Sequence, residues 1–220
     1  MGQTASFENS VRILPVSSVE QDSQTLTCQN FQNVAAICLE DTTPKPALTA
    51  ELKKFMTSLP PLTSRKVCVL KDVSFYDLTE NLQKALKEKL RRTDLPALTE
   101  VERDIREYTL PRVKNLLTGR EDVTLTFLFQ RGGQVKPAKW HLDSHLPDGR
   151  LRLLRAVTGA GPDIAIRGAF KDAVHPDFDV ESFEATPTGL CVFDGKNHVH
   201  RTPGMQSGDE TDFRAAYVIT

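Results

Sequence analysis

Two residues with the spacing of metal ligands, His141 and Asp143, lie in the stretch W-H-L-D. On a β-strand, residues two positions apart point to the same face, so this imidazole and this carboxylate would lie side by side. An H-x-D sequence also arises by chance, and the two side chains then form a buried hydrogen-bonded pair. The other histidines of the chain bear on which interpretation holds.

His198 and His200 follow the apolar run 189–194 and supply the missing ligand type. One histidine from this segment would complete a set of two histidines and one carboxylate. Such a set holds Fe(II) on one face and leaves the other positions open for substrate and dioxygen. Because the two histidines are two positions apart, both could face the metal on a strand, and one could then support a ligand without binding the ion.

The remaining histidines are poorer candidates. His145 follows His141 at the helical spacing of a zinc site, but Leu142 stands where the H-E-x-x-H pattern has glutamate, and P-D-G at 147–149 indicates a turn. We therefore predict that His145 is a loop residue. His175 precedes a proline in a polar segment, and we expect it to be solvated.

Arg214 stands among small apolar residues in the last segment, 213–220. On a strand it would share a face with Ala216 and Val218. A guanidinium on an inward face requires an anion, and its planar fork matches a carboxylate. This residue is therefore a candidate for binding an acidic ligand.

The order of these motifs resembles the Fe(II)/2-oxoglutarate-dependent dioxygenases, whose fold is a double-stranded β-helix related to the jelly roll. The resemblance covers roughly residues 121–220. It implies that His141, Asp143 and His200 bind iron, and that Arg214 holds the distal carboxylate of the co-substrate 2-oxoglutarate. It favours His200 over His198, because H-R-T-P at 200–203 matches the H-x-x-P turn common after the distal ligand.

The resemblance implies an enzyme that hydroxylates or demethylates a substrate that the sequence does not identify. If Arg214 faced outward, Arg152 or Arg155 on the segment 151–157 would hold the co-substrate instead. The W-H-L-D and H-R-T-P stretches are also similar to a bacterial family of uncharacterised proteins, which implies no substrate.

Two other functions remain open at this point. The first is a cupin-like protein that binds zinc, manganese or iron through His141, Asp143, His198 and His200, without a keto acid. The second is a non-catalytic β-helix domain that binds a partner through the helical half of the chain.

The elements that would position these residues change character at Gly119. After it, short strand candidates alternate with turn residues, as in a sandwich or barrel; they are 123–129, 139–143, 151–157, 189–194, 198–201 and 213–220. Before it, strand candidates at 11–16, 34–39 and 66–70 accompany amphipathic helices. We therefore predict an α+β protein of one compact domain, in which a C-terminal double-stranded β-helix (121–220) packs against an N-terminal region of helices and mixed structure (1–120).

Three helix predictions rest on capping and breaking residues. Thr49 would cap a helix that ends at Pro60-Pro61. Asp77 and Glu80 resemble a capping box, and Thr99 and Glu102 repeat it. Pro111 should kink or split the last of these helices before Gly119.

Composition restricts the class of protein. The chain has 220 residues, with 39% hydrophobic and 26% charged residues, and its formal net charge is −1. These values are ordinary for a soluble globular protein and argue against a nucleic-acid binder. The sequence has no apolar stretch of the length that a membrane span needs. The four cysteines are scattered, so we expect no disulfide framework and a cytoplasmic location. The first six residues fit the N-myristoylation pattern, which is weak evidence for a lipid anchor.

Overall fold

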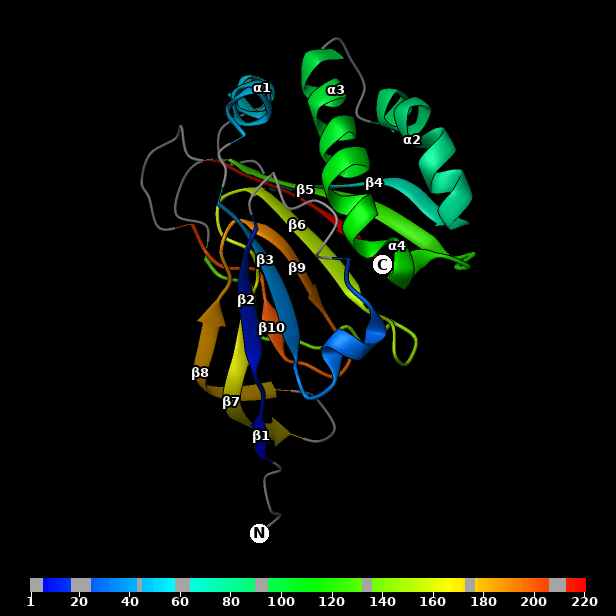
Figure 1. The fold of residues 1–220 in the computed structure, drawn as a ribbon. Coiled ribbons are helices and arrows are strands. Elements are labelled where there is room, and N and C mark those ends of the chain that lie inside the picture. The colour runs from blue at the N-terminus through cyan, green and yellow to red at the C-terminus, as the bar shows by residue number, and fades with distance from the viewer. Residues whose placement is uncertain are drawn as a thin grey trace.

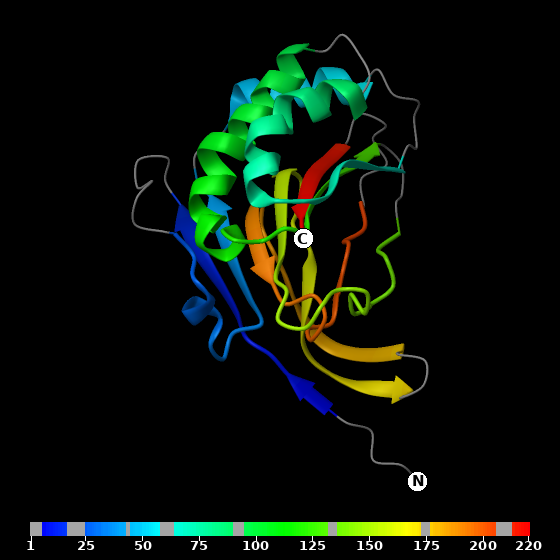
Figure 2. The same ribbon diagram turned by 90° about the vertical axis from the view of Figure 1, so that its right-hand side faces the viewer.

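The computed structural model describes residues 6–16, 25–42, 45–57, 64–89, 95–131, 136–172, 177–205 and 213–220. In these ranges a large sheet packs against a small one, and helices cover the outer face of the large sheet (Figures 1 and 2). The predicted mixed α+β class is confirmed. The strands are β1 (Ser6–Glu8), β2 (Val11–Val16), β3 (Ala36–Asp41), β4 (Ser64–Val73), β5 (Val123–Arg131), β6 (Arg152–Thr158), β7 (Asp163–Asp172), β8 (Asp177–Ala185), β9 (Gly189–Phe193), β10 (His200–Arg201) and β11 (Phe213–Ile219).

The large sheet combines strands from both halves of the chain in the order β2-β3-β9-β6-β11-β5-β4. Its four central strands come from the C-terminal half and are antiparallel to one another. β3 pairs with β9 on one side and β4 with β5 on the other, while β2 lies parallel to β3. The small sheet has the order β1-β7-β10, with β8 also paired to β7. N-terminal strands therefore cover both edges of the central four strands, which would otherwise leave unpaired backbone groups.

Both faces of the central strand β11 are buried. On β11, Ala215, Tyr217 and Ile219 belong to the core shared with the helices. Ala216 and Val218 instead face the small sheet, and this side is called the inner face below. A strand buried on both faces reads as a continuous apolar run, which explains why this segment was recognisable in the sequence.

The predicted helices are present, although they begin earlier than expected. They are α1 (Pro46–Thr57), α2 (Phe75–Lys89), α3 (Leu95–Arg103) and α4 (Leu110–Leu117), and Cys28–Phe31 forms a short 3-10 helix, η1. The residue that caps α2 is Ser74 rather than Asp77, because the Ser74 hydroxyl oxygen accepts the backbone N–H of Asp77 at 3.0 Å. The predicted caps at Thr49 and Thr99 lie inside α1 and α3, so those two assignments were wrong.

Pro111 does not end the helix in which it lies. A π-helical segment, η2 (Asp104–Thr109), connects α3 to α4, and the N–H of Leu110 donates to the carbonyl of Ile105. Proline lacks the N–H that would complete the normal pattern of the preceding turn, and the wider turn accommodates it. The chain therefore stays helical from Leu95 to Leu117.

The strand predictions near the histidines need correction. Segment 139–143 is not a strand; only His141 forms a bridge, to His200. The predicted strand 198–201 shortens to β10. β7 and β8 were missed, although Phe178 and Val180 alternate with acidic residues as in a half-exposed strand. Residues 1–5 of the acylation pattern, Pro60-Pro61 and His175 lie outside the described residues, and no described helix is long and apolar enough to cross a membrane.

Candidate metal centre

His141, Asp143 and His200 come together between the two sheets. Each offers one ligand atom, and these atoms all lie within 4.8 Å of one another. The Nε2 atom of His200 is 3.4 Å from Asp143 Oδ2, and the Nε2 atom of His141 is 3.9 Å from Oδ1. His200 and Asp143 are buried, whereas the side chain of His141 is 43% exposed. The cluster is therefore open on the His141 side.

A backbone bridge holds the two histidines together. The N–H of each donates to the carbonyl of the other at 3.0 Å, and the rings lie 4.4 Å apart. His200 lies on β10, which pairs with β7, and its ring packs edge-on against Phe193 of β9 at 4.8 Å. The distal histidine is thus fixed by both sheets at once.

The imidazoles are oriented as metal ligands require. Nδ1 of His141 lies 2.9 Å from the carbonyl of Lys139, and Nδ1 of His200 lies 2.9 Å from the carbonyl of His198. A proton on Nδ1 then donates to the carbonyl and leaves the Nε2 lone pair free. Nε2 of His200 is buried and has no hydrogen-bond partner among the described residues. An orphaned ring nitrogen aimed at a carboxylate fits a metal ion between them.

Asp143 is held through both its carboxylate and its backbone. Arg152 Nη1 donates to Oδ2 at 2.5 Å, and the backbone N–H of Asp143 donates to the carbonyl of Gly195 at 2.7 Å. Gly195 packs so closely that a Cβ at this position would collide with Oδ2. The sequence analysis did not single out Gly195, although its Asp-Gly pair between two strands is a turn signal.

Replacing Gly195 with alanine tests this close packing. The added methyl group should displace the Asp143 carboxylate, so we expect metal affinity to fall roughly 10- to 100-fold, as for other supports of a metal ligand. The measurement is calorimetric titration with Mn(II), together with circular dichroism to show that the fold is retained. Unchanged affinity in a folded variant would show that Asp143 is free to relax.

The protonation states also suit metal binding. Burial alone would raise the pKa of Asp143, but the nearby His200 and Arg152 outweigh it and hold that pKa well below its usual range. Burial lowers the pKa of His200, so its imidazole is neutral at pH 7. An ionised carboxylate beside a neutral imidazole is the form that binds a divalent cation.

His198 and His145 lie apart from this cluster. The group of possible ligands found among the described residues contains His200 and not His198. The His198 side chain is partly buried, and burial lowers its pKa. His145 is an exposed loop residue, as predicted. The geometry therefore offers three protein ligands and not the four of the cupin-like alternative.

Arg214 lies on the inner face with its guanidinium incompletely paired. It is 4% exposed; Nε donates to the carbonyl of Ala160 at 2.8 Å, and Nη1 donates to Gln130 Oε1 at 3.3 Å. Nη2 is buried and has no partner among the described residues. Burial lowers the pKa of Arg214 to about 10, so it remains charged at pH 7. A buried cation with a free donor fits a carboxylate of a bound ligand.

The two alternative arginines have other partners. Arg155 points to the helix side of the sheet, where it pairs with Asp104 at 3.0 Å and with Asp41 at 2.7 Å. Arg152 is on the inner face but binds Asp143. Arg214 is thus the one of the three that combines an inward position with no carboxylate partner among the described residues.

A cavity of about 650 Å³ adjoins the metal ligands. It extends along the inner face of β5 and β11 to the segment that carries His141 and Asp143. This volume lies in the range of small-molecule sites.

Comparisons with known proteins bear on the fold. The crystal structure of a dioxygenase for auxin oxidation from rice matches with a TM-score of 0.50 and 13% identity, over 96% of this chain and 82% of that chain. The chain has the fold of a dioxygenase. The predicted resemblance to the oxygenase superfamily is confirmed for the fold.

Other solved structures match at lower scores. An oxidoreductase of the 2OG-Fe(II) oxygenase family from Burkholderia pseudomallei matches with a TM-score of 0.45 and 11% identity, over 96% of this chain and 94% of that chain. A prolyl-4-hydroxylase from Pseudomonas putida matches with a TM-score of 0.44 and 14% identity, over 88% and 95%. No protein-family model and no curated protein matches the sequence, so the resemblance to a bacterial family of uncharacterised proteins stays a prediction.

Proposed function

We propose that the protein is an Fe(II)- and 2-oxoglutarate-dependent dioxygenase that hydroxylates or demethylates its substrate. The observation that carries this proposal is the His141–Asp143–His200 group, with the orphaned Nε2 atom of His200 aimed at Asp143. Two imidazoles and one carboxylate are the ligand set of non-haem Fe(II) oxygenases. The fold is consistent with this activity.

The same proposal assigns the finer architecture and the co-substrate site. The four central strands of the large sheet and the strands of the small sheet would form the double-stranded β-helix predicted for residues 121–220. Arg214 would bind the distal carboxylate of 2-oxoglutarate, and Gln130 would hold the guanidinium in place. We also propose that the protein is cytoplasmic and that its partner is a small-molecule co-substrate.

Each residue of the site has a separate task. When bound, Fe(II) supplies the oxidative decarboxylation of 2-oxoglutarate to succinate, coupled to oxidation of the substrate. His141, Asp143 and His200 would hold the ion, and Arg152 orients Asp143. The inner face would exclude bulk water from the co-substrate through the apolar residues Ala216 and Val218.

The test is binding followed by turnover. Anaerobic addition of Fe(II) and 2-oxoglutarate should produce the visible absorption band of the iron–keto acid chelate. Admission of oxygen should then convert 2-oxoglutarate to succinate, even without a second substrate. Purified protein that shows neither the band nor succinate would contradict the proposal.

Replacing Arg214 with glutamine tests the assignment of the co-substrate site. Because the charge-assisted contact is lost, we expect the Kd for 2-oxoglutarate to rise roughly 10- to 100-fold. Arg214→Lys should show an intermediate loss, and Arg167→Gln, at an exposed position on β7, should leave the Kd unchanged. Equal affinities of the Arg214→Gln variant and the wild type would assign the co-substrate to another cation.

A further inference from the structure

The cavity beside the metal ligands lies apart from the proposed co-substrate site. His141 and Asp143 line it, but Arg214 is not among its described lining residues. On the inner face, Arg214 pairs in register with Gln130, and the cavity begins at the next inward-facing residue of β5, Leu128. If 2-oxoglutarate extends from the metal to Arg214, this cavity remains for the substrate. The inference below thus rests on the proposed function.

One of the cations that line the cavity has no carboxylate partner among the described residues. Each lining aspartate has a cationic partner within the lining: Lys71 with Asp72 at 3.8 Å, Arg150 with Asp122, and Arg152 with Asp143 at 2.5 Å. Lys66 also lines the cavity with an exposed side chain, and no carboxylate among the described residues pairs with it. In addition, Nε of Arg152 is buried and has no hydrogen-bond partner in the part of the chain that the structure describes. The cavity therefore offers two unpaired donors among the described residues, the ammonium of Lys66 and Nε of Arg152.

The direction of Lys66 follows from its place in the sheet. Lys66 on β4 pairs in register with Leu128 of β5, which in turn pairs with Ala216 of β11. Residues in register across adjacent strands share a face, so Lys66 lies on the inner face at the edge of the sheet. Its ammonium can thus enter the cavity without contact with the metal ligands.

The rest of the lining combines apolar side chains with hydroxyl groups. Leucine and valine side chains supply the apolar surface, and threonines supply the hydroxyls; these residues are Leu128, Leu142, Leu146, Val218, Thr124, Thr126 and Thr220. A volume of about 650 Å³ suits one metabolite-sized molecule. A ligand that matches both the charge and the surface has an apolar body and an acidic group.

We propose that the substrate is a small amphipathic organic acid, whose carboxylate or phosphate binds the cationic groups of this cavity, Lys66 foremost. An ion pair of this kind discriminates against a neutral analogue, because the analogue leaves the Lys66 ammonium and the buried Nε of Arg152 unpaired. The acid would anchor the substrate while its apolar part lies against Leu128 and Val218, beside the metal.

The experiment compares an acid with its neutral counterpart. Anaerobic protein loaded with Fe(II) and 2-oxoglutarate is titrated calorimetrically with 3-phenylpropionate and with 3-phenylpropionamide. We expect the acid to bind about tenfold more tightly than the amide. Lys66→Glu should remove this preference, whereas Lys87→Glu, the same charge change at an exposed position on α2, should retain it.

The outcomes separate the two proposals. Equal binding of acid and amide, no binding of the acid, or an unaltered preference in Lys66→Glu would overturn the acidic substrate. If the iron–keto acid band itself fails to appear, the proposed function fails first. A chelate band together with an acid preference that depends on Lys66 supports both.

Discussion

Replacing Asp143 with alanine is expected to abolish Fe(II) binding and the turnover of 2-oxoglutarate. Asp143 is the one carboxylate of the three-residue group, and it supplies the negative charge that imidazole ligands do not. Its loss should lower the affinity for Fe(II) by more than the roughly 10- to 100-fold expected when a residue that only supports a ligand is removed. The measurements are Fe(II) retained after desalting and succinate formed under air.

A control variant in the same segment separates loss of the ligand from general damage. Asp148→Ala removes a carboxylate that is 90% exposed and pairs with Lys196 on the surface. We expect this variant to keep its metal and its activity. If Asp143→Ala keeps Fe(II) at the wild-type level, the ion is bound elsewhere and the metal centre described above is wrong.

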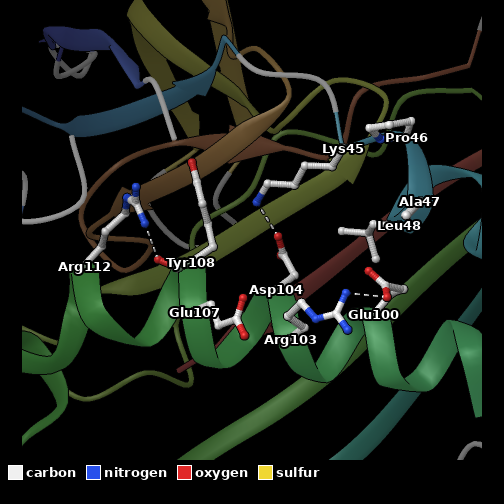
Figure 3. Close-up of a pocket in the computed structure, with 10 residues that line it drawn as sticks. All are labelled: Lys45, Pro46, Ala47, Leu48, Glu100, Arg103, Asp104, Glu107, Tyr108 and Arg112. Atoms are coloured by element: carbon white, nitrogen blue, oxygen red, sulfur yellow. Dashed lines mark hydrogen bonds and ion pairs between the residues drawn. The ribbon is translucent and has the colours of Figure 1, made fainter. Parts of the chain in front are cut away.

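Replacing Asp104 with asparagine is expected to cause the largest loss of stability. Asp104 is buried on the π-helical segment and accepts hydrogen bonds from Lys45 at 2.5 Å, Arg155 at 3.0 Å and Tyr217 at 2.9 Å. Figure 3 shows the Lys45 contact at the rim of a second cavity, of about 300 Å³. Removal of the charge leaves Arg155 buried with less compensation, which should lower the free energy of unfolding by about 3–5 kcal/mol.

Urea denaturation of the wild type and of the Asp104→Asn variant measures this difference in the free energy of unfolding. Glu100→Gln on α3 is the control, because its ion pair with Arg103 is partly exposed and contributes little. We expect this control to change the free energy of unfolding by less than about 1 kcal/mol. A loss of similar size in both variants would show that the buried network has no special role.

The ion pairs of Asp104 with Arg155 and Lys45 predict that the stability of the fold depends on pH. Burial alone would raise the pKa of Asp104, but Arg155 and Lys45 outweigh it, so the folded-state pKa lies below the unfolded value of about 3.9. A lowered pKa contributes stability that is complete above the unfolded value and is lost as the pH falls toward the folded value. The stability difference between wild type and Asp104→Asn should therefore be full at pH 7 and shrink below about pH 4. A difference that grows on acidification would contradict this account.

Much of the candidate site could be predicted from the sequence, because its motifs are local. The H-x-D spacing predicted His141 and Asp143 as ligands, and the resemblance to the oxygenases predicted His200 and Arg214. The apolar runs of β9 and β11 were recognisable because both of their faces are buried. The helices were recognisable from the spacing of their apolar residues, although Ser74 shows that capping residues can be misassigned by a few positions.

Only the tertiary structure decided what surrounds these residues. From the sequence, Arg152 and Arg155 could each have bound the co-substrate. In the structure Arg152 binds Asp143, and Arg155 binds Asp104 across the helix–sheet interface. The close packing of Gly195 on Asp143 and the bridge between His141 and His200 join segments far apart in the chain. Residue type and local periodicity determine which side chains can do chemistry and which face of an element is apolar. The partner of each buried charged group is instead determined by the pairing of distant strands. An unpaired buried charge is too costly to tolerate, so each such group needs a partner. No local sequence pattern shows which distant group supplies it.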